Sequence, residues 1–478
     1  MPVSKDFLPL FGSSGQGSSI YEIDQSIRFN DNDSAYLTRT PSSAGNRRTF
    51  TYSTWLKRGN LYQDHFIFTA IADTSNFFGV YLDDSSHSTD NTLRVYEYNG
   101  NSLQHWVYSG STRFRDTAAW YHFVIRVDTT NAIANDRIRI YSNGTRIRNL
   151  TQNQQPSLNY ETRVNTTSPH HISYAYGSLY FDGYQAEINF LDGYAYGPEY
   201  FGETNSSGIW IPKAYSGSYG TNGFYITGSD SSNLGKNEAS GNTFAAYTSS
   251  GLAANDQRAD TPTNNQIVFN THNNQRRGGT LSNGNLDYVG PGTRTNITLT
   301  ANVPTTGKWV VAYKVGAVST NSGWQIGLST ANDDDFGDAA GSNEDLDLVR
   351  LQPQGSNVEI NDKVNNSYIT PSPTLPITTS DEFWVAVDMD SGNIFMGIYD
   401  ASDSTMKFIA ADGGSDGNPA TGANPTLTAS TAQMPRDNVA FSVGSKQTSQ
   451  HIYLQRSTEV SGTIPDGYTY FENVKDLL

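Results

Sequence analysis

The stretch IYSNGTRI, residues 140–147, decides the fold of this chain. Its Asn143-Gly144 pair follows the run RIRI (137–140), in which polar and apolar residues alternate. Asn-Gly readily adopts the two positive φ angles that a two-residue hairpin turn requires, and strict alternation indicates a strand with one buried face. The stretch therefore predicts a β-hairpin, and the rest of the sequence must show what such a hairpin supports.

The composition describes a large acidic chain made of short strands. It has 478 residues, enough for two or three domains, and no cysteine, which excludes disulfides and thiolate chemistry. Its 47 acidic and 31 basic residues give a net charge of -16, so its surface repels phosphate backbones and we expect no nucleic-acid partner. The 29 tyrosines, with many Gly, Ser, Thr and Asn residues between short apolar runs, are typical of strands joined by turns.

Neither secretion nor membrane insertion is expected. Residues 1–17 lack the basic region and apolar core of a signal peptide. No run of about 18 apolar residues occurs, so the sequence predicts no membrane partner. We therefore expect the chain to be made in the cytoplasm of the producing cell without a signal peptide.

Two blocks of candidate strands follow one another, with a connector of Pro, Gly, Ser and Tyr at 206–257 in which Trp210, Tyr215 and Tyr219 can pack. Regular spacing and turn residues between the strands predict a two-sheet antiparallel sandwich for the first block. The first block contains FTYSTWLKR (50–58), DHFIFTAI (64–71), FFGVYL (77–82), TLRVYEY (92–98), WYHFVIRVD (120–128), DRIRIYS (136–142) and GSLYFDGYQAEINFLDG (177–193). The second contains KWVVAYKVG (308–316), SGWQIGLST (322–330), DEFWVAVDMDSGNIFMGIYD (381–400) and NVAFSVGS (438–445).

Both blocks resemble known domain families. FTYSTWLKR, WYHFVIRVD, RIYSNGTRI and LYFDGYQAEINFLDG occur in the order seen in laminin-G-like, concanavalin-A-like jelly-roll domains. KWVVAYKV and DEFWVAVDMDSGNIFMGIYD resemble the opening strand and the paired strands of SPRY-type domains, which are two-sheet binding scaffolds. The resemblance implies that the hairpin at Asn143-Gly144 is a scaffold element.

We therefore expect an all-β chain of two antiparallel β-sandwich (jelly-roll) domains in tandem with a short N-terminal arm. The expected boundaries are 1–20 for the arm, 21–205 for the laminin-G/concanavalin-A-like jelly roll, 206–257 for the connector, 258–455 for the SPRY-like sandwich and 456–478 for a C-terminal strap.

No catalytic constellation is recognisable. A jelly-roll glucanase needs paired carboxylates facing one sugar, but Glu187 and Asp192 are separated by an odd number of residues and should point to opposite faces of a strand. We expect a solvent-facing Glu187 and an Asp192 in a turn. His122, in WYHFVIRV, occupies a scaffold position of the family that the chain resembles, and no zinc pattern or nucleophilic serine elbow occurs. The sequence predicts no enzyme and no catalytic residues.

Two acidic loops, YLDDSSHSTDN (81–91) and NDDDFGDAAGSNEDLD (332–347), are candidate calcium sites, because calcium accepts flexible sets of carboxylate oxygens. The resemblance strengthens the first, since laminin-G-like domains often hold calcium at one edge. The alternative for both is a solvated acidic loop, and no other cofactor is indicated. The candidate ligands are Asp83, Asp84, Asp90, Asp333, Asp335 and Asp338.

A sugar has an apolar ring face and a rim of hydroxyls, so glycan sites combine aromatic faces with hydrogen-bonding side chains. Tyrosines recur in one region of the chain. We favour their burial against the second domain, with a glycan platform as the alternative, and assign no ligand-binding residue. These tyrosines are Tyr174, Tyr176, Tyr194, Tyr196 and Tyr200.

The stretch SIRFNDNDSAYLTRTPSSAGNRRTFTYSTWLKRG (26–59) resembles the start of structural proteins from tailed bacteriophages of aquatic bacteria. The resemblance implies a non-enzymatic virion protein: a tail fibre, a tail-associated adhesin, or a capsid fibre or decoration. Its partners would be other virion proteins, host-surface polysaccharide and further copies in a symmetric homo-oligomer. A polysaccharide depolymerase and a purely structural assembly protein remain the alternatives.

The Gly/Ser-rich arm carries an apolar patch of Phe7, Leu8, Leu10 and Phe11. An apolar patch on a flexible lead can insert into a groove of a partner. The arm is therefore the predicted point of attachment to the virion.

Overall fold

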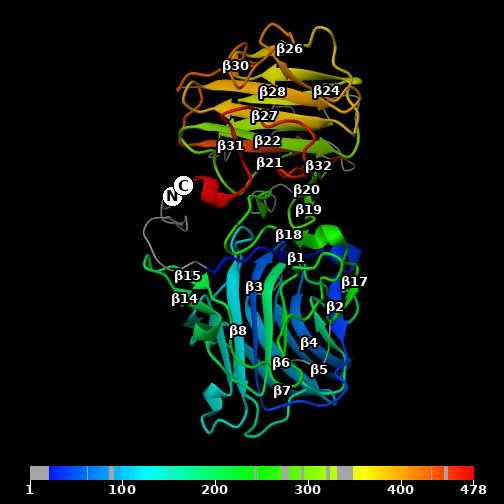
Figure 1. Cartoon of the computed structure of the whole chain (residues 1–478), viewed down its shortest axis with the longest axis vertical. Coiled ribbons are helices and arrows are strands. Elements are labelled where there is room, and N and C mark those ends of the chain that lie inside the picture. The colour runs from blue at the N-terminus through cyan, green and yellow to red at the C-terminus, as the bar shows by residue number, and fades with distance from the viewer. Residues whose placement is uncertain are drawn as a thin grey trace. The chain divides into compact units, whose positions relative to one another are not determined.

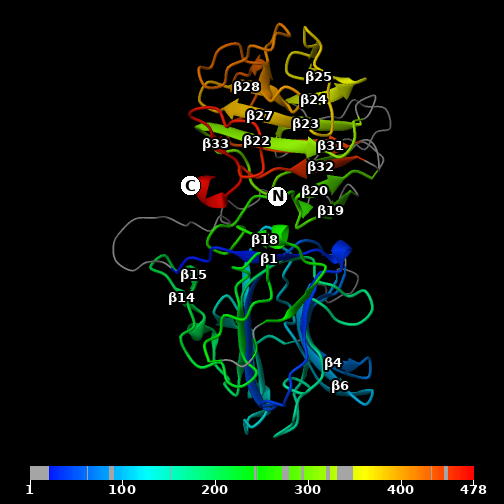
Figure 2. The ribbon, with the colours of Figure 1, turned by 45° about the vertical axis from the view of Figure 1, so that its right-hand side comes forward.

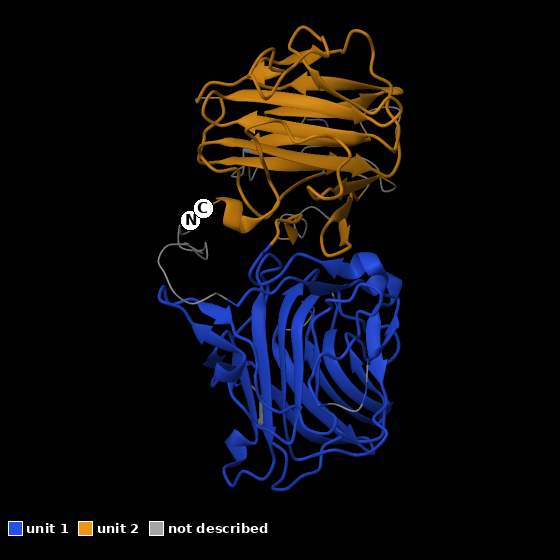
Figure 3. Cartoon of the chain, in the orientation of Figure 1, with its two compact units in different colours: residues 1–265 blue, residues 266–478 orange. Residues whose placement is uncertain are grey.

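The computed structural model describes residues 21–61, 63–84, 91–150, 152–241, 244, 246–271, 279–291, 295–318, 323–330, 348–431, 433–445 and 450–477. The chain divides into two compact units, Met1–Asn265 and Gln266–Leu478 (Figure 3). Each is a sandwich of sheets whose strands pair antiparallel, apart from one short parallel pair in the second unit, and this confirms the predicted all-β tandem. Within the described ranges no helix has the length and apolarity that crossing a membrane requires.

Unit 1 is built from short and medium strands with turns of 3₁₀ helix at their connections (Figure 1). Its strands are β1 (Ser26–Phe29), β2 (Tyr36–Arg39), β3 (Thr49–Arg58), β4 (His65–Asp73), β5 (Asn76–Leu82), β6 (Leu93–Asn99), β7 (Ser102–Tyr108), β8 (Tyr121–Asp128), β9 (Ile138–Ser142), β10 (Thr145–Arg146), β11 (Gln152–Gln154), β12 (His170–Ile172), β13 (Gly183–Asp192), β14 (Gly202–Thr204), β15 (Trp210–Pro212), β16 (Phe224–Ile226), β17 (Thr248–Ser250) and β18 (Gln257–Arg258). Its turns are η1 (Asp31–Asp33), η2 (Ala134–Asp136), η3 (Pro198–Tyr200) and η4 (Ala254–Asp256).

Sixteen of these strands form two facing layers (Figure 2), and β14 pairs with β15 in a separate two-stranded sheet. Sheet A has the order β10-β9-β8-β3-β13-β1-β18, with β16 also paired to β13, and sheet B has the order β11-β7-β6-β5-β4-β12-β2-β17. Alternate side chains of both sheets, such as Phe50 and Leu56 of β3 and Phe68 of β4, meet in one buried core. The β-sandwich therefore follows from the alternation seen in the sequence.

The predicted hairpin is present at the edge of sheet A. Asn143 and Gly144 have φ angles of 45° and 76°, and Ser142 pairs with Thr145. A Cβ on Gly144 would lie 2.4 Å from the Trp210 ring, so this glycine also makes room for a side chain from a later segment. Trp210 lies in the segment for which the sequence predicts a connector.

Residues 206–257 contribute strands to the sheets of unit 1. β16 pairs with β13, β17 pairs with β2, and β18 pairs with β1. Trp210, Tyr215 and Tyr219 pack against the outer face of sheet A, as the sequence predicted for the connector. The segment is therefore an integral part of the first sandwich.

A buried ion pair joins Asp260, which follows β18, to Lys57 of β3 in sheet A. Lys57 Nζ lies 2.8 Å from Asp260 Oδ2, and the two side chains are each 1% exposed. Asp260 also accepts a hydrogen bond from Trp120 Nε1 at 2.9 Å, and Asn265 Oδ1 accepts one from Lys57 Nζ at 2.8 Å. These neighbours satisfy the pair where water cannot reach it.

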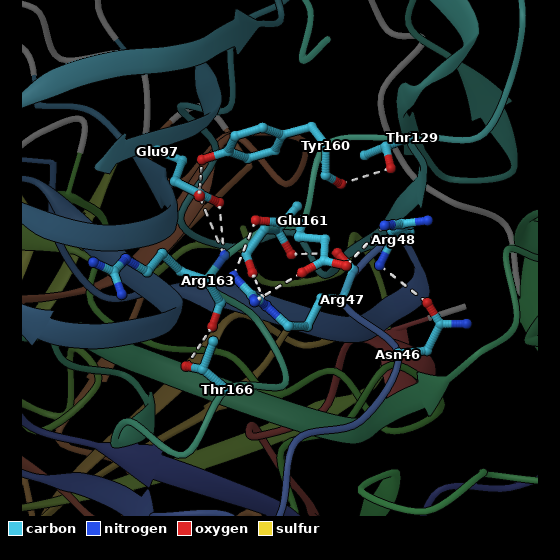
Figure 4. Close-up of polar contacts among 10 residues, drawn as sticks. Asn46, Arg47, Arg48, Glu97, Thr129, Tyr160, Glu161, Arg163 and Thr166 are labelled. Atoms are coloured by element: carbon cyan, nitrogen blue, oxygen red, sulfur yellow. Dashed lines mark hydrogen bonds and ion pairs between the residues drawn. The ribbon is translucent and has the colours of Figure 1, made fainter. Parts of the chain in front are cut away.

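A second polar cluster holds residues of the loop 155–168 against β6 and the segment that precedes β3 (Figure 4). Glu97 of β6 is fully buried and accepts hydrogen bonds from Tyr160 Oη at 2.7 Å and from the Arg163 backbone N–H at 3.1 Å. Arg47 pairs with Glu161 at 3.0 Å and donates to the Thr162 carbonyl. The loop is thus tied to sheet B through Glu97 and to the segment that leads into β3 through Arg47.

Burial raises the pKa of Glu97 to about 7, although the hydrogen bonds from Tyr160 and Arg163 act in the opposite direction. Arg163 and Arg47 are the nearby positive charges that also favour the carboxylate. The desolvation of the charged form therefore outweighs its partners.

Unit 2 contains β19 (Thr280–Ser282), β20 (Asp287–Val289), β21 (Thr295–Thr298), β22 (Lys308–Val315), β23 (Trp324–Thr330), β24 (Val349–Gln354), β25 (Asn357–Asp362), β26 (Ser367–Ile369), β27 (Glu382–Asp388), β28 (Asn393–Asp400), β29 (Thr405–Ile409), β30 (Leu427–Thr428), β31 (Val439–Ser445), β32 (His451–Leu454), β33 (Thr469–Tyr470) and η5 (Val474–Leu477). Sheet C has the order β19-β20-β32-β22-β27-β28-β29, with β30 beside β28 and β33 beside β22. Sheet D has the order β21-β31-β23-β24-β25-β26.

The long run at 381–400 forms the hairpin β27–β28, as its pattern predicts. Asp388 Oδ1 accepts the backbone N–H groups of Asp390 and Ser391 at 3.0 and 3.1 Å, which fixes the turn. The C-terminal residues Tyr468 and Tyr470 cover Trp384 on the outer face of sheet C. The predicted strap thus packs on its own sandwich.

We expect Lys57→Met to lower the unfolding free energy of unit 1 by about 3–5 kcal/mol, because it leaves the Asp260 carboxylate buried without its cation. Chemical denaturation followed by tryptophan fluorescence measures the change. Lys213→Met is the matched control, since its pair with Glu203 is about half exposed and should contribute about 1 kcal/mol or less. Equal effects of the two substitutions would contradict the role given to the buried pair.

Glu97 should make unit 1 less stable as the pH rises. The pKa of Glu97 in the folded state, about 7, exceeds its ordinary value of 4.5. Its contribution to the unfolding free energy is therefore complete below pH 4.5 and is lost as the pH rises through 7. The loss amounts to roughly 3 kcal/mol, and Glu97→Gln should remove this dependence. Urea unfolding at pH 5 and pH 8 tests it, with Glu161→Gln, an exposed glutamate of the same loop, as the control. An unchanged pH dependence in Glu97→Gln would show that another group is responsible.

Candidate functional site

The outer face of sheet B carries a cluster of aromatic side chains. Cross-strand pairing places Phe66 opposite Tyr81, and Tyr96 opposite Trp106. The alternate positions on these strands, such as Val95, belong to the buried core, so the aromatic rings lie on the opposite, outward face. We call this set the aromatic face. It comprises Phe66, Phe77, Tyr81, Tyr96, Tyr98, Trp106, Tyr108 and, from the loop after β12, Tyr176.

The rings form two layers. Phe66 stacks on Tyr81 with centroids 4.8 Å apart, and Phe77 stacks on Tyr98 at 5.6 Å. Phe66, Phe77 and Tyr81 are buried, whereas Tyr96, Tyr98, Trp106 and Tyr176 are only half-buried. The buried and the half-buried rings thus pack side by side, and only the half-buried ones reach solvent.

Gly79 makes this packing possible. A Cβ at this position would lie 3.0 Å from the Tyr96 ring and 3.1 Å from the Phe66 ring. The glycine at the centre of β5 therefore lets two rings from neighbouring strands approach over its backbone.

The loop after β12 forms one border of the aromatic face. Thr69 Oγ1 donates to the Tyr174 carbonyl at 2.8 Å, and the Tyr174 ring stacks on Tyr36 at 4.7 Å. Tyr176 meets Phe77 edge-on at 5.2 Å. The border is therefore anchored to the sheet.

Polar tips accompany the rings. Burial raises the pKa values of Tyr81 and Tyr96 above their ordinary range, so both phenols keep their protons and can donate. The Arg94 guanidinium lies 5.1 Å from the Tyr108 ring centroid and pairs with Asp83. The face thus combines apolar ring area, hydroxyl donors and a neutralised cation.

Asp83, a predicted calcium ligand, is the partner of Arg94. Its Oδ1 accepts hydrogen bonds from Thr92, and its Oδ2 pairs with the guanidinium. Asp84 donates its backbone N–H to Asp64 at 3.1 Å. Within the described ranges, no group of three or more acidic or histidine side chains is arranged to hold a metal ion. The other predicted ligands lie outside the described residues, so the calcium sites stay a prediction; these are Asp90, Asp333, Asp335 and Asp338.

The apolar patch of the arm also lies outside the described residues, and its role in attachment stays a prediction. Its members are Phe7, Leu8, Leu10 and Phe11.

Glu187 is not solvent-facing, and that expectation was wrong. A bulge between Ala186 and Asn189 gives Glu187 a φ of 51°, and the residue is only 8% exposed. Its carboxylate accepts hydrogen bonds from Tyr21 at 2.8 Å and from Tyr225 at 2.7 Å. The bulge breaks the alternation on which the expectation relied.

Asp192 is a buried acceptor that ties three segments together. It accepts hydrogen bonds from the backbone N–H groups of Asn46 and Asn222 at 2.7 and 2.9 Å and from Asn165 Nδ2 at 2.9 Å. Both Glu187 and Asp192 are therefore occupied by protein donors.

The scaffold role predicted for His122 is confirmed. Its ring lies between Trp55 and Trp210, with centroids at 4.8 and 5.9 Å. Trp210 Nε1 donates to Nδ1 at 3.0 Å, so the proton of the neutral ring is on Nε2, 2.9 Å from Ser53 Oγ. Burial lowers the pKa of His122 to about 3, which keeps it neutral.

The tyrosines singled out in the sequence divide between two surfaces. Tyr174 and Tyr176 border the aromatic face, whereas Tyr194, Tyr196 and Tyr200 form a ladder on the segment over sheet A. Tyr200 stacks on Tyr196 at 4.1 Å and is 42% exposed. The ring contacts described for all five lie within unit 1.

Sequence reasoning missed the centre of the aromatic face. The stretch that could have revealed it is VYEYNGNSLQHWVY (95–108). On either side of its Asn99-Gly100 pair, aromatic residues alternate with other residues: Tyr96, Tyr98, Trp106 and Tyr108. A second hairpin with aromatic residues on one face was therefore readable from the sequence.

Comparison with known proteins gives only low similarity over the whole chain. None of the curated proteins compared with it matches at a significant level. A heptameric SAP-like pentraxin from Limulus polyphemus is 15% identical over 37% of this chain and 80% of its own, with a TM-score of 0.26. The SPRY domain of human HERC1 is 16% identical over 37% of this chain and 92% of its own, with a TM-score of 0.25. The mouse laminin α1 domains LG4-5 are 8% identical over 98% of this chain and 91% of their own, with a TM-score of 0.28. Likenesses at this level add nothing to the architecture described above.

A family model gives the firmer comparison. Residues 30–196 match Laminin_G_3, described as the concanavalin A-like lectin/glucanases superfamily. The matched range begins just after β1, contains β2–β13 and therefore includes every strand that carries the aromatic face. This part of the chain is thus similar to concanavalin A-like lectins and glucanases, in agreement with its two facing antiparallel sheets.

Proposed function

We propose that the chain is a non-enzymatic adhesin of a tailed-bacteriophage particle, which binds host-surface polysaccharide through the aromatic face. The observation that carries the proposal is the half-buried ring layer of Tyr96, Tyr98 and Trp106 on a concanavalin A-like jelly roll. Large apolar side chains on an outward sheet face indicate an interaction surface.

The chemistry of the face suits a sugar. The C–H face of a pyranose packs on an aromatic ring, and its hydroxyls need donors and acceptors at the ring margins. The phenol of the half-buried Tyr96, which keeps its proton, supplies such a group. Each contact is weak, so several copies in a symmetric virion fitting would raise the avidity for a repeating polymer.

The virion role is supported by the resemblance of residues 26–59 to the start of phage structural proteins. Attachment through the apolar patch of the N-terminal arm belongs to the same proposal. A neighbouring virion protein is the alternative occupant of the aromatic face.

A depolymerase is the rival function, because the superfamily of residues 30–196 includes glucanases. Glycoside hydrolysis needs two carboxyl groups facing the scissile bond. Glu187 is held by two tyrosines and Asp192 by three asparagines, which disfavours this acidic pair as the catalytic one. We therefore favour binding over cleavage.

We expect Trp106→Ala and Tyr98→Ala each to weaken binding to host polysaccharide about tenfold, the loss of about 1.4 kcal/mol when one ring no longer stacks. Biolayer interferometry on immobilised polysaccharide measures affinity, and thermal unfolding checks that the variants fold. Tyr200→Ala, an exposed ring on the other surface of unit 1, is the matched control.

Unchanged affinity in both variants would refute the aromatic face as the binding site. New reducing ends after incubation with the purified protein would identify a depolymerase instead. Absence of the chain from purified particles, tested with a specific antibody, would refute the virion role.

A further inference from the structure

Unit 2 contains a cleft of about 560 Å³ at the open edge of its sandwich. One wall comes from the end of sheet D, where Asp362 of β25 pairs with Ser367 of β26, and the other from the segment 410–428, which includes β30. β26 and β30 lie at the same end of the unit (Figure 1). Ile369 pairs with the core residue Ile360, so the cleft residues of β26 face inward, between the sheets.

Hydrogen bonds fix polar side chains of the cleft and leave some of their oxygen atoms as available acceptors. Asn365 donates its Nδ2 to Asp362 at 2.7 Å, and Asn424 donates its Nδ2 to Asp416 at 2.8 Å. Because a carboxylate only accepts, each asparagine must offer its NH₂ group to it and keep its Oδ1 for another donor. Asp412 uses Oδ1 to accept the Gly414 N–H at 2.8 Å.

The cleft therefore presents acceptors. No described partner engages the Oδ1 atoms of the two asparagines or the second oxygen of Asp412. Asn365, Asp412 and Asn424 are exposed, so these atoms are accessible. A ligand rich in hydroxyl donors complements such a set, whereas an acceptor-rich ligand does not.

Charge sharpens this preference. The lining residues include Asp362 and Asp412 but no lysine, arginine or histidine. Anionic groups would meet repulsion without a compensating cation. Ile369, Leu427 and Pro425 add apolar surface, which suits the C–H face of a sugar ring.

We propose that this cleft is a second glycan site, which takes a neutral sugar residue through its hydroxyl donors and excludes sugars that carry carboxylates. The inference deepens the proposed function, since it concerns the same class of ligand. It uses a separate site, so the two can succeed or fail independently.

The test uses the full chain and two probes, the neutral trisaccharide cellotriose and the acidic trigalacturonate, followed by saturation-transfer NMR and calorimetry. The binding variant is Ser367→Phe, which places a ring at the mouth of the cleft. The matched control is Ser356→Phe, an exposed serine in the turn at the other end of β25. A double variant, Tyr98→Ala with Trp106→Ala, removes the aromatic face.

We expect cellotriose to bind to the double variant, to lose at least tenfold in affinity when Ser367→Phe is added, and to be unaffected by Ser356→Phe. Trigalacturonate should not bind the double variant. Three results would each overturn the proposal: no cellotriose binding in the double variant, equal binding of trigalacturonate, or an unchanged affinity in Ser367→Phe. The first of these leaves the aromatic face intact as a site, because that face is tested by its own variants in the otherwise unchanged chain.

Discussion

The register between β5, β6 and β7 is the constraint on which the candidate site depends. Pairing Gly79 with Tyr96 and Tyr96 with Trp106 puts one row of side chains outward and the next row into the core. A slip of one residue would exchange the two rows, burying the polar tips and exposing the valines. The same pairing therefore stabilises the sandwich and creates its aromatic face.

The two sheets of unit 1 use their outer faces differently. Sheet A is covered by the segment that carries Trp210 and Tyr219, and its outward residues, including His122, become a second core. Sheet B is bordered by a loop but keeps half-buried rings at its centre. Aromatic side chains are thus left partly exposed to solvent on one side of the unit.

Much of the architecture could be predicted from the sequence, because alternation and turn residues act locally. The hairpin at Asn143-Gly144 and the strands at 50–58, 77–82 and 308–316 lie within a residue or two of their predicted ends. The role of residues 206–257 was harder to predict, because β16, β17 and β18 are only two or three residues long and gain their stability from strands far away in the chain.

The candidate sites were less predictable for the same reason. Glu187 departs from alternation at a bulge in β13. The hydrogen-bond donors to its carboxylate, Tyr21 and Tyr225, are distant in sequence. The acceptors of the cleft in unit 2 come from segments about sixty residues apart, such as Asn365 and Asn424, which no local pattern connects. Hydrogen bonds between distant residues produce no periodic pattern in the sequence, whereas the aromatic hairpin produces one.

The position of β1 has a consequence for synthesis of the chain. Its Arg28 pairs with Asp256, which lies 228 residues later in the sequence. The two neighbours of β1 in sheet A are β13 and β18. β1 is translated before both partners, so one of its edges stays open until β13 has been made and the other until β18 has been made. Its brevity, four residues ending in Phe29, limits the edge available for pairing with another nascent chain during that interval.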